Sequence, residues 1–149
     1  MIPLHYTDSC IFFEVFSISK EKLRQMARKY FYDVNKEHQG VVSSLSLGEI
    51  TDGLLELPLQ KDREDSFFNI SQHLKNFKIV YPKFEDYQLA LELRSLYYNL
   101  EPADALHLAM AVTNKVQVFM TLGERKLVDN PILEKFCRER GLKIKILGA

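Results

Sequence analysis

The sequence predicts an α/β fold, a three-layer α/β/α sandwich with a mainly parallel central sheet. Short segments rich in β-branched and aromatic residues recur along the chain, and segments with helical spacing of apolar residues separate them. Such alternation is typical of a parallel sheet with helices on both faces. The 149 residues, 46% hydrophobic and 27% charged, are enough for one domain with a full core, which we expect to span 1–149.

The first half of the chain alternates between strands and helices in this way. The stretch 2–7, IPLHYT, is predicted as a strand from its β-branched and aromatic content. Apolar residues recur at helical spacing in KEKLRQMARKYFYDVNK, within a predicted helical segment 10–36. A second strand is expected at 40–46, GVVSSLS, and a helix at 46–57 with Ser46 as its cap.

The second half repeats the alternation up to the last strand. Its strand segments FKIVYP, VQVFMT and LKIKIL carry the same residue types, with helical patterns between them. In chain order we predict a helix at 62–76, a strand at 77–82, helices at 84–98 and 102–114, a strand at 116–121, a helix at 131–140 and a strand at 142–147. No repeat or long Pro/Gly/Ser linker divides the chain.

Composition excludes several classes of protein. No apolar run is long enough for a membrane span, and the start MIPLHYTDSCIFFEVF lacks the basic region of a secretory signal. Cys10 and Cys137 provide neither a disulfide framework nor a Cys-rich zinc site, so we expect a protein of the cytoplasm with both thiols buried and unreactive. No membrane partner is expected.

The charge is balanced overall but clustered locally. Twenty basic and twenty acidic residues give a formal net charge of +0, which argues against coating nucleic acid by charge alone. The segment 20–36 holds six basic and two acidic residues, an excess of four positive charges. This segment is either a solvated helix face, which is the interpretation we favour, or a basic patch that binds along the phosphates of a nucleic-acid backbone.

Four side chains are expected to meet at one end of the sheet. Asp8 follows the first strand, Glu49 follows the second, Asp104 opens the helix 102–114, and Thr121 closes the fourth strand. In a parallel sheet, strand ends of this kind lie at the same edge. Each residue also has an ordinary structural explanation: Glu49 in a capping box with Ser46, Asp104 at a helix N-terminus, and Asp8 in a turn.

The chemistry of such a cluster is limited by what the chain lacks. The sequence has no Walker-type phosphate loop, no G-x-G-x-x-G and no G-x-S-x-G nucleophile motif. Its histidines show no metal-type pairing, and His107, one turn after Asp104, is interpreted as a surface or core histidine. Carboxylate oxygens remain, and these suit Mg²⁺ or Mn²⁺, which would offset the repulsion among clustered acids.

Four blocks of the sequence resemble a known family. YTDSCIFFEV, SSLSLGEI, PADALHLAMAV and VFMT resemble, in order, the motifs of the PIN-domain nucleases. The resemblance implies that Asp8, Glu49 and Asp104 are the acidic metal-site residues and that Ser9 and Thr121 are the family's hydroxyl residues. Gly123 stands where the family often has a fourth acidic residue, so one bound metal ion is expected more readily than two. Cys10 stands where the family often has Asn.

The resemblance also implies an activity and partners. It implies a Mg²⁺- or Mn²⁺-dependent endoribonuclease that hydrolyses single-stranded or structured RNA, with catalysis by Asp8, Glu49, Asp104 and Thr121. Many such proteins are homodimeric toxins silenced by an antitoxin protein, so both partners are implied. The alternative is a catalytically weak or inactive PIN-like module that binds RNA or protein. A phosphoacceptor receiver domain needs an aspartate that ends a central strand and a lysine after a late strand, and VYPKFED and FMTLGER fit that pattern poorly.

Overall fold

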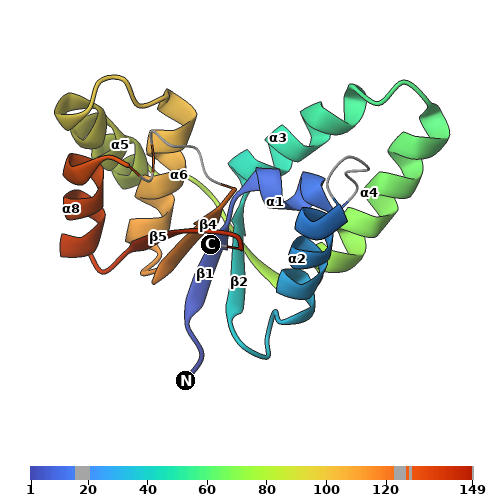
Figure 1. Cartoon of the computed structure of the whole chain (residues 1–149). Helices are drawn as coiled ribbons and strands as arrows, with labels where there is room; N and C mark the ends of the chain where they lie inside the picture. The colour runs from blue at the N-terminus through green and yellow to red at the C-terminus, as the bar shows by residue number, and fades with distance from the viewer. Residues whose placement is uncertain (16–20, 123–126, 128, 149) are drawn as a thin grey trace.

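The computed structural model describes residues 1–15, 21–122, 127 and 129–148. Strands and helices alternate along these residues as predicted (Figure 1). In chain order the elements are β1 (Leu4–Thr7), α1 (Ser9–Glu14), α2 (Glu21–Tyr32), β2 (Gln39–Ser43), α3 (Ser44–Leu55), α4 (Gln60–Leu74), β3 (Phe77–Val80), α5 (Phe84–Leu96), α6 (Pro102–Thr113), β4 (Val118–Thr121), α8 (Pro131–Glu139) and β5 (Lys143–Ile146).

Within the described residues, five parallel strands form one sheet in the order β3-β2-β1-β4-β5. The central strand is β1, whose Tyr6 is in register with Val41 of β2 on one side and Phe119 of β4 on the other. The chain first winds outward from β1 to β3 and then returns to the other side of β1. In sheets wound in this way, the ligand crevice lies at the carboxyl ends of the strands beside the reversal.

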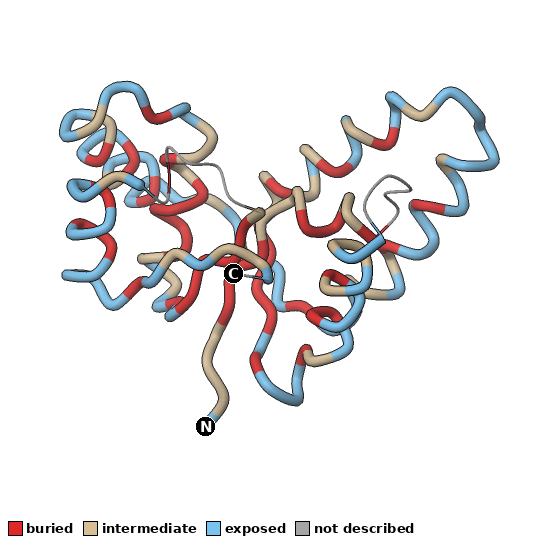
Figure 2. Tube along the Cα trace, in the orientation of Figure 1, coloured by how far each residue is buried: buried red, intermediate tan, exposed pale blue. Residues whose placement is uncertain are grey.

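Helices cover both faces of the sheet, which confirms the three-layer α/β/α prediction (Figure 1). On one face, α1 to α4 pack on the sheet through a core that includes Phe12, Ile50 and Phe77. On the other, α5, α6 and α8 pack through a second core that includes Leu108 and Phe119. The three inner strands β1, β2 and β4 are largely buried, whereas the edge strands β3 and β5 are partly exposed (Figure 2).

Side chains at the ends of strands begin the helices that follow. Asp8, in extended conformation, caps α1 by accepting a hydrogen bond from Ser9 N at 2.8 Å. Ser43 caps α3 by accepting one from Ser46 N at 3.1 Å. Pro102 is the first residue of α6. A backbone N–H at this position has no acceptor within the helix, so proline, which lacks the N–H, is well tolerated there. The Asp8 and Ser43 caps therefore couple the ends of β1 and β2 to the helices that follow them.

The predicted capping box of Ser46 and Glu49 is wrong. Since α3 begins at Ser44 with Ser43 as its cap, Glu49 lies in the second turn of the helix, beyond reach of the free N-terminal donors. The predicted segment 10–36 also differs: α2 ends at Tyr32, and Asn35 has a φ of 67°, which a right-handed helix cannot accommodate. Residues 16–20 of that segment lie outside the described part.

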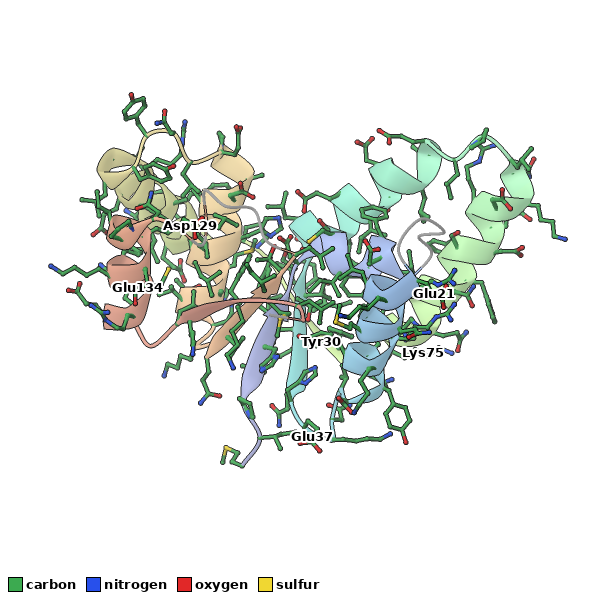
Figure 3. All side chains as sticks on the ribbon, in the orientation of Figure 1. Glu21, Tyr30, Glu37, Lys75, Asp129 and Glu134 are labelled. Carbon is green, nitrogen blue, oxygen red and sulfur yellow. The ribbon has the colours of Figure 1, made fainter. Side chains whose placement is uncertain are left out.

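A stack of aromatic side chains lies near the opposite, amino-terminal edge of the sheet. The His5 and His38 rings stack with their centroids 4.3 Å apart, and Tyr30 of α2 stacks on His38 at the same distance. Figure 3 shows Tyr30 beside the sheet and Glu37 farther out toward solvent. Burial, with a smaller effect of His38 and Lys145, lowers the pKa of His5 to about 4. His5 is therefore neutral in the folded protein at neutral pH.

We expect this stack to make the protein acid-sensitive. The unfolded chain binds a proton at His5 below its ordinary pKa of about 6.5, whereas the folded chain does so only near pH 4. Stability from this group is thus fully present above pH 6.5 and is lost as the pH falls toward 4, by about 2 to 3 kcal/mol. Urea unfolding between pH 7.5 and 4.5 measures the loss, and His5→Gln should make the pH dependence shallower. Equal slopes in the two proteins would contradict the expectation.

Candidate metal centre

A cavity of about 340 Å³ opens at the carboxyl ends of β1 and β4. All four predicted site residues line it, although they come from separate parts of the chain. Its lining residues are Asp8, Ser9, Cys10, Glu49, Asp104, Thr121 and Leu122. The structure thus brings Asp8, Glu49, Asp104 and Thr121 to one place, while their roles as metal ligands or catalytic groups stay predictions.

Asp8 is held from two sides. Its backbone N–H donates to the Met120 carbonyl at 3.0 Å, which continues the pairing of β1 with β4. Its Oδ1 accepts from Ser9 N at 2.8 Å, and its Oδ2 accepts from the buried Thr121 Oγ1 at 2.9 Å. The direction of this carboxylate is therefore fixed by the sheet and by the start of α1, so that it needs little reorganisation to bind a ligand.

Glu49 is held by a histidine and a serine. Its Oε1 lies 2.8 Å from Nε2 of His107, and the Ser9 hydroxyl donates a second hydrogen bond to the carboxylate. Burial raises the pKa of Glu49, but these hydrogen bonds and the charge of His107 outweigh burial and bring the pKa below its usual value. Glu49 is consequently ionised at neutral pH.

Asp104 approaches the cavity from the other side of the sheet edge. It is the third residue of α6, after Pro102, as the sequence predicts. A carboxylate in this first turn interacts favourably with the positive end of the helix dipole. The same position places it in the wall of the cavity with Asp8 and Glu49, so the helix terminus accounts for its location without excluding a role in the site.

The sequence interpretation missed the part that His107 plays. Its side chain belongs to the core, with only 1% of the residue exposed, yet both ring nitrogens contact polar partners: Glu49, and the Tyr6 hydroxyl at 2.5 Å from Nδ1. One ligand-type atom from each of Asp8, Glu49 and His107 lies within 4.8 Å of the others. The only sequence signal was its place one turn after Asp104, because Glu49 is distant along the chain.

Cys10 departs from the expectation that both thiols are buried. Cys137 is buried, but Cys10 is half-buried and lines the cavity, with its Sγ 3.7 Å from Thr121 Oγ1. Desolvation, together with the charge of Asp8, raises the pKa of Cys10 to about 12. Its thiol therefore stays protonated at neutral pH, in agreement with the expected lack of reactivity.

The described residues 21–36 of the basic segment do not supply cations to the cavity wall. None of the described residues that line the acidic cavity is basic. Lys22 and Lys29 line a different hollow, beside Leu147, and Arg28 and Lys36 line a third one. This arrangement favours the solvated helix face over a phosphate-following patch at the site. Gly123 and Glu124, where a fourth acid was considered, lie outside the described residues.

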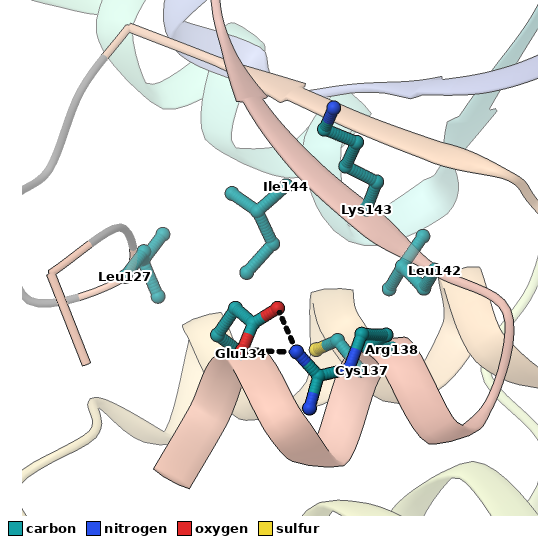
Figure 4. Close-up of a pocket in the computed structure, with 7 residues that line it drawn as sticks. All are labelled: Leu127, Glu134, Cys137, Arg138, Leu142, Lys143 and Ile144. Atoms are coloured by element: carbon teal, nitrogen blue, oxygen red, sulfur yellow. Dashed lines mark hydrogen bonds and ion pairs between the residues drawn. The ribbon is translucent and has the colours of Figure 1, made fainter. Parts of the chain in front are cut away.

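A further cavity, of about 370 Å³, has a different character (Figure 4). It lies between α8 and β5, and aliphatic side chains such as Leu127, Leu142 and Ile144 form much of its wall. Its carboxylate, Glu134, is paired with Arg138 at 3.0 Å. This cavity therefore lacks the gathered carboxylates that distinguish the cavity at the sheet edge.

The donor atoms of the acidic cavity fit a hard divalent cation. Three carboxylates share one wall without a basic lining residue in the described part, and a bound cation would reduce their mutual repulsion. Oxygen ligands of this kind suit Mg²⁺ and Mn²⁺.

Among the described residues, no helix has the length and apolar character needed to cross a membrane.

Comparison with solved structures agrees with the fold. Several solved structures resemble the chain. One is a DNA-bound VapBC from Salmonella typhimurium, with 15% identity, 99% of each chain covered and a TM-score of 0.67. A second is a toxin-antitoxin complex from Klebsiella pneumoniae, with 19% identity, 86% of this chain and 93% of that chain covered, and a TM-score of 0.63. Another is VapC20 from Mycobacterium tuberculosis, a Sarcin-Ricin loop cleaving toxin (12% identity, 83% of this chain and 94% of that one, TM-score 0.64).

The remaining comparisons are with sequences. A search of curated proteins finds no match. The family model for the PIN domain matches residues 6–130, a range that includes Asp8, Glu49, Asp104 and Thr121. This match covers most of the 149 residues. The chain belongs to the PIN domain family.

Proposed function

We propose that this protein is a metal-dependent endoribonuclease that hydrolyses phosphodiester bonds in RNA. The observation that carries the proposal is the single cavity lined by Asp8, Glu49 and Asp104, at the sheet edge where the winding of the chain reverses. Membership of the PIN domain family supports the reaction class. The cation would be Mg²⁺ or Mn²⁺, held by these three carboxylates.

A bound cation supplies two things to such a reaction: it makes an attacking water more acidic, and it stabilises the negative charge that builds up on the phosphate. The residues of this chain prepare the site. Thr121 and the backbone N–H of Ser9 fix the direction of Asp8, and His107 and the Ser9 hydroxyl fix that of Glu49. The carboxylates are thus ordered before the reaction, which lowers the cost of binding.

The charges of the cavity predict that metal is required for substrate binding as well as for the chemical step. An RNA phosphodiester is negatively charged, and three carboxylates on the cavity wall repel it. No described lining residue is basic, and a bound cation would offset this repulsion. We therefore expect RNA to bind weakly at this cavity in the metal-free protein.

We also propose that the chain is the toxin of a toxin-antitoxin pair. The likeness to a toxin-antitoxin complex and to a toxin that cleaves the Sarcin-Ricin loop supports this proposal. An antitoxin protein, a homodimeric state, and a single-stranded or structured RNA substrate are the corresponding expectations. Co-expression of the chain with the product of a neighbouring small open reading frame, followed by co-purification, tests the first of them.

Removal of metal is expected to abolish cleavage. The purified protein should cut single-stranded and hairpin RNA when Mn²⁺ or Mg²⁺ is present. EDTA should reduce the rate by at least about 100-fold, because the reaction loses both the activation of water and the charge stabilisation. Gel analysis of labelled RNA measures the rates, and excess Mn²⁺ should restore them. Cleavage that persists in EDTA would contradict the proposal, and metal binding without cleavage of any RNA would favour the inactive module.

A further inference from the structure

A circuit of buried and part-buried hydrogen bonds begins and ends on helix α3. Ser43, the cap of α3, accepts a hydrogen bond from the Tyr6 hydroxyl at 2.6 Å. The Tyr6 oxygen lies 2.5 Å from Nδ1 of His107, and Nε2 of His107 lies 2.8 Å from Oε1 of Glu49. The circuit thus leaves α3 at its N-terminus, passes through β1 and α6, and returns to α3 at Glu49.

This circuit connects two helices whose buried residues belong to different cores. Helix α3 packs through Ile50 in the core on one face of the sheet, and α6 packs through Leu108 in the core on the other. Each core positions its own helix against the sheet. The hydrogen bond from His107 to Glu49 joins the two helices directly at the carboxyl edge, and these are the helices that carry Glu49 and Asp104.

The hydrogen bonds of the circuit restrict the motion of the side chains that they join. Tyr6 and Ser43 are fully buried, and His107 nearly so. In an environment of low polarity, satisfied polar groups are strongly held, and removal of one leaves its partners unpaired at a cost. A glutamate side chain has several rotatable bonds, and ordering it costs rotamer entropy. Because the circuit orders Glu49 when the protein folds, this entropy is not lost again when a ligand binds.

The position of His107 argues for a supporting role and against direct coordination. His107 is absent from the lining of the acidic cavity, which Glu49 does line. Both of its ring nitrogens are already engaged, one with Tyr6 and the other with Glu49. A histidine used as a ligand would instead need one nitrogen directed at the ion.

We propose that His107 is a positioning residue that sets the Glu49 carboxylate relative to Asp8 and Asp104, through the Ser43–Tyr6–His107–Glu49 circuit. This inference rests on the proposed function, because it assumes that the cavity binds a divalent cation. His107 does not contact the cation. It determines how tightly the cation binds by keeping α3 and α6 in register across the sheet edge.

The test compares Mn²⁺ affinity in variants of the full chain. His107→Ala should weaken Mn²⁺ binding, measured by calorimetry, by about 10- to 100-fold, the usual effect of losing a group that orients a ligand. His107→Gln should recover much of this loss, because its amide can donate to Glu49 from nearly the place of Nε2. His38→Gln is the matched control: this buried histidine stands at the other edge of the sheet, and the variant should bind Mn²⁺ like the unaltered protein.

A second variant and a spectroscopic measurement complete the test. Tyr6→Phe keeps the ring that stacks on Phe119 but removes the hydroxyl, and should weaken Mn²⁺ binding less than His107→Ala does. Circular dichroism confirms that each variant is folded, and Tyr6→Phe decides the matter if His107→Ala does not fold. Electron spin-echo spectra of bound Mn²⁺ should show no directly coordinated ¹⁴N.

Failure of the positioning role and failure of the nuclease function give different results. Unchanged Mn²⁺ affinity in the folded His107→Ala and Tyr6→Phe variants would overturn the positioning role, as would a ¹⁴N coupling typical of a coordinated imidazole. Weaker binding in these variants without RNA cleavage by the unaltered protein would support the positioning role and overturn the proposed nuclease function. An unaltered protein that binds no Mn²⁺ would overturn both.

Discussion

Replacement of Asp8 by asparagine is expected to reduce RNA cleavage by at least about 100-fold, since even a group that only supports a metal ligand contributes 10- to 100-fold. The substitution removes one negative charge from the cavity but keeps the side-chain shape. Asparagine is as good a helix cap as aspartate, so the hydrogen bond from Ser9 N can remain. Initial rates of cleavage of labelled RNA at saturating Mn²⁺ measure the effect, with thermal unfolding as a check on the fold.

A matched control for this variant lies on α3. Asp52 is exposed and absent from the cavity lining, although it is on the same helix as Glu49. Asp52→Asn removes the same charge from the protein and should leave the cleavage rate within about twofold, because exposed charges at this range are screened by salt. If both variants lose activity equally, or neither does, the cavity is not the centre of the reaction.

The largest loss of stability is expected from replacing Phe119 with alanine. Phe119 lies on β4, is 1% exposed and stacks on Tyr6 with the ring centroids 5.2 Å apart. Its removal should lower the free energy of unfolding by about 3 to 5 kcal/mol, because burial is lost and a cavity is left in the core shared by the sheet and α6. Urea unfolding monitored by circular dichroism gives the value.

Two comparisons separate packing from a general intolerance to substitution. Phe119→Leu keeps most of the buried volume and should cost much less than alanine. Phe84→Ala removes the same atoms from a side chain that is 75% exposed, and should change stability by no more than about 0.5 kcal/mol. A cost for Phe84→Ala as large as that of Phe119→Ala would mean that the exposed face of α5 is covered in solution.

Much of the fold follows from local patterns in the sequence. The strands are short runs of β-branched and aromatic residues, and the sheet is parallel because helical segments separate them. The positions of Asp8 and Thr121 at the strand ends could be predicted for the same reason: a residue that follows a parallel strand lies at the carboxyl edge whatever its distant neighbours are. Pro102 fixed the start of α6, and with it the place of Asp104.

The remainder depends on contacts that no local pattern records. Both Ser43 and Ser46 are able to cap a helix, and in the folded protein Ser43 is the cap, accepting from Ser46 N and from the Tyr6 hydroxyl inside the core. The pairing of His107 with Glu49 joins residues 58 positions apart on opposite sides of the sheet. The cation-rich segment 20–36 could not be placed from its composition, because its direction relative to the cavity depends on how α2 crosses the sheet.

The central place of β1 has a consequence for synthesis on the ribosome. Asp8 leaves the exit tunnel early, but its partner Thr121 lies 113 residues later, and Asp104 is also late. A nascent polypeptide can bring β1, β2 and β3 together well before β4 exists, yet its acidic pocket stays incomplete until most of the chain has been translated. For an RNA-cutting protein, this delay would spare the messenger and the ribosome that are producing it.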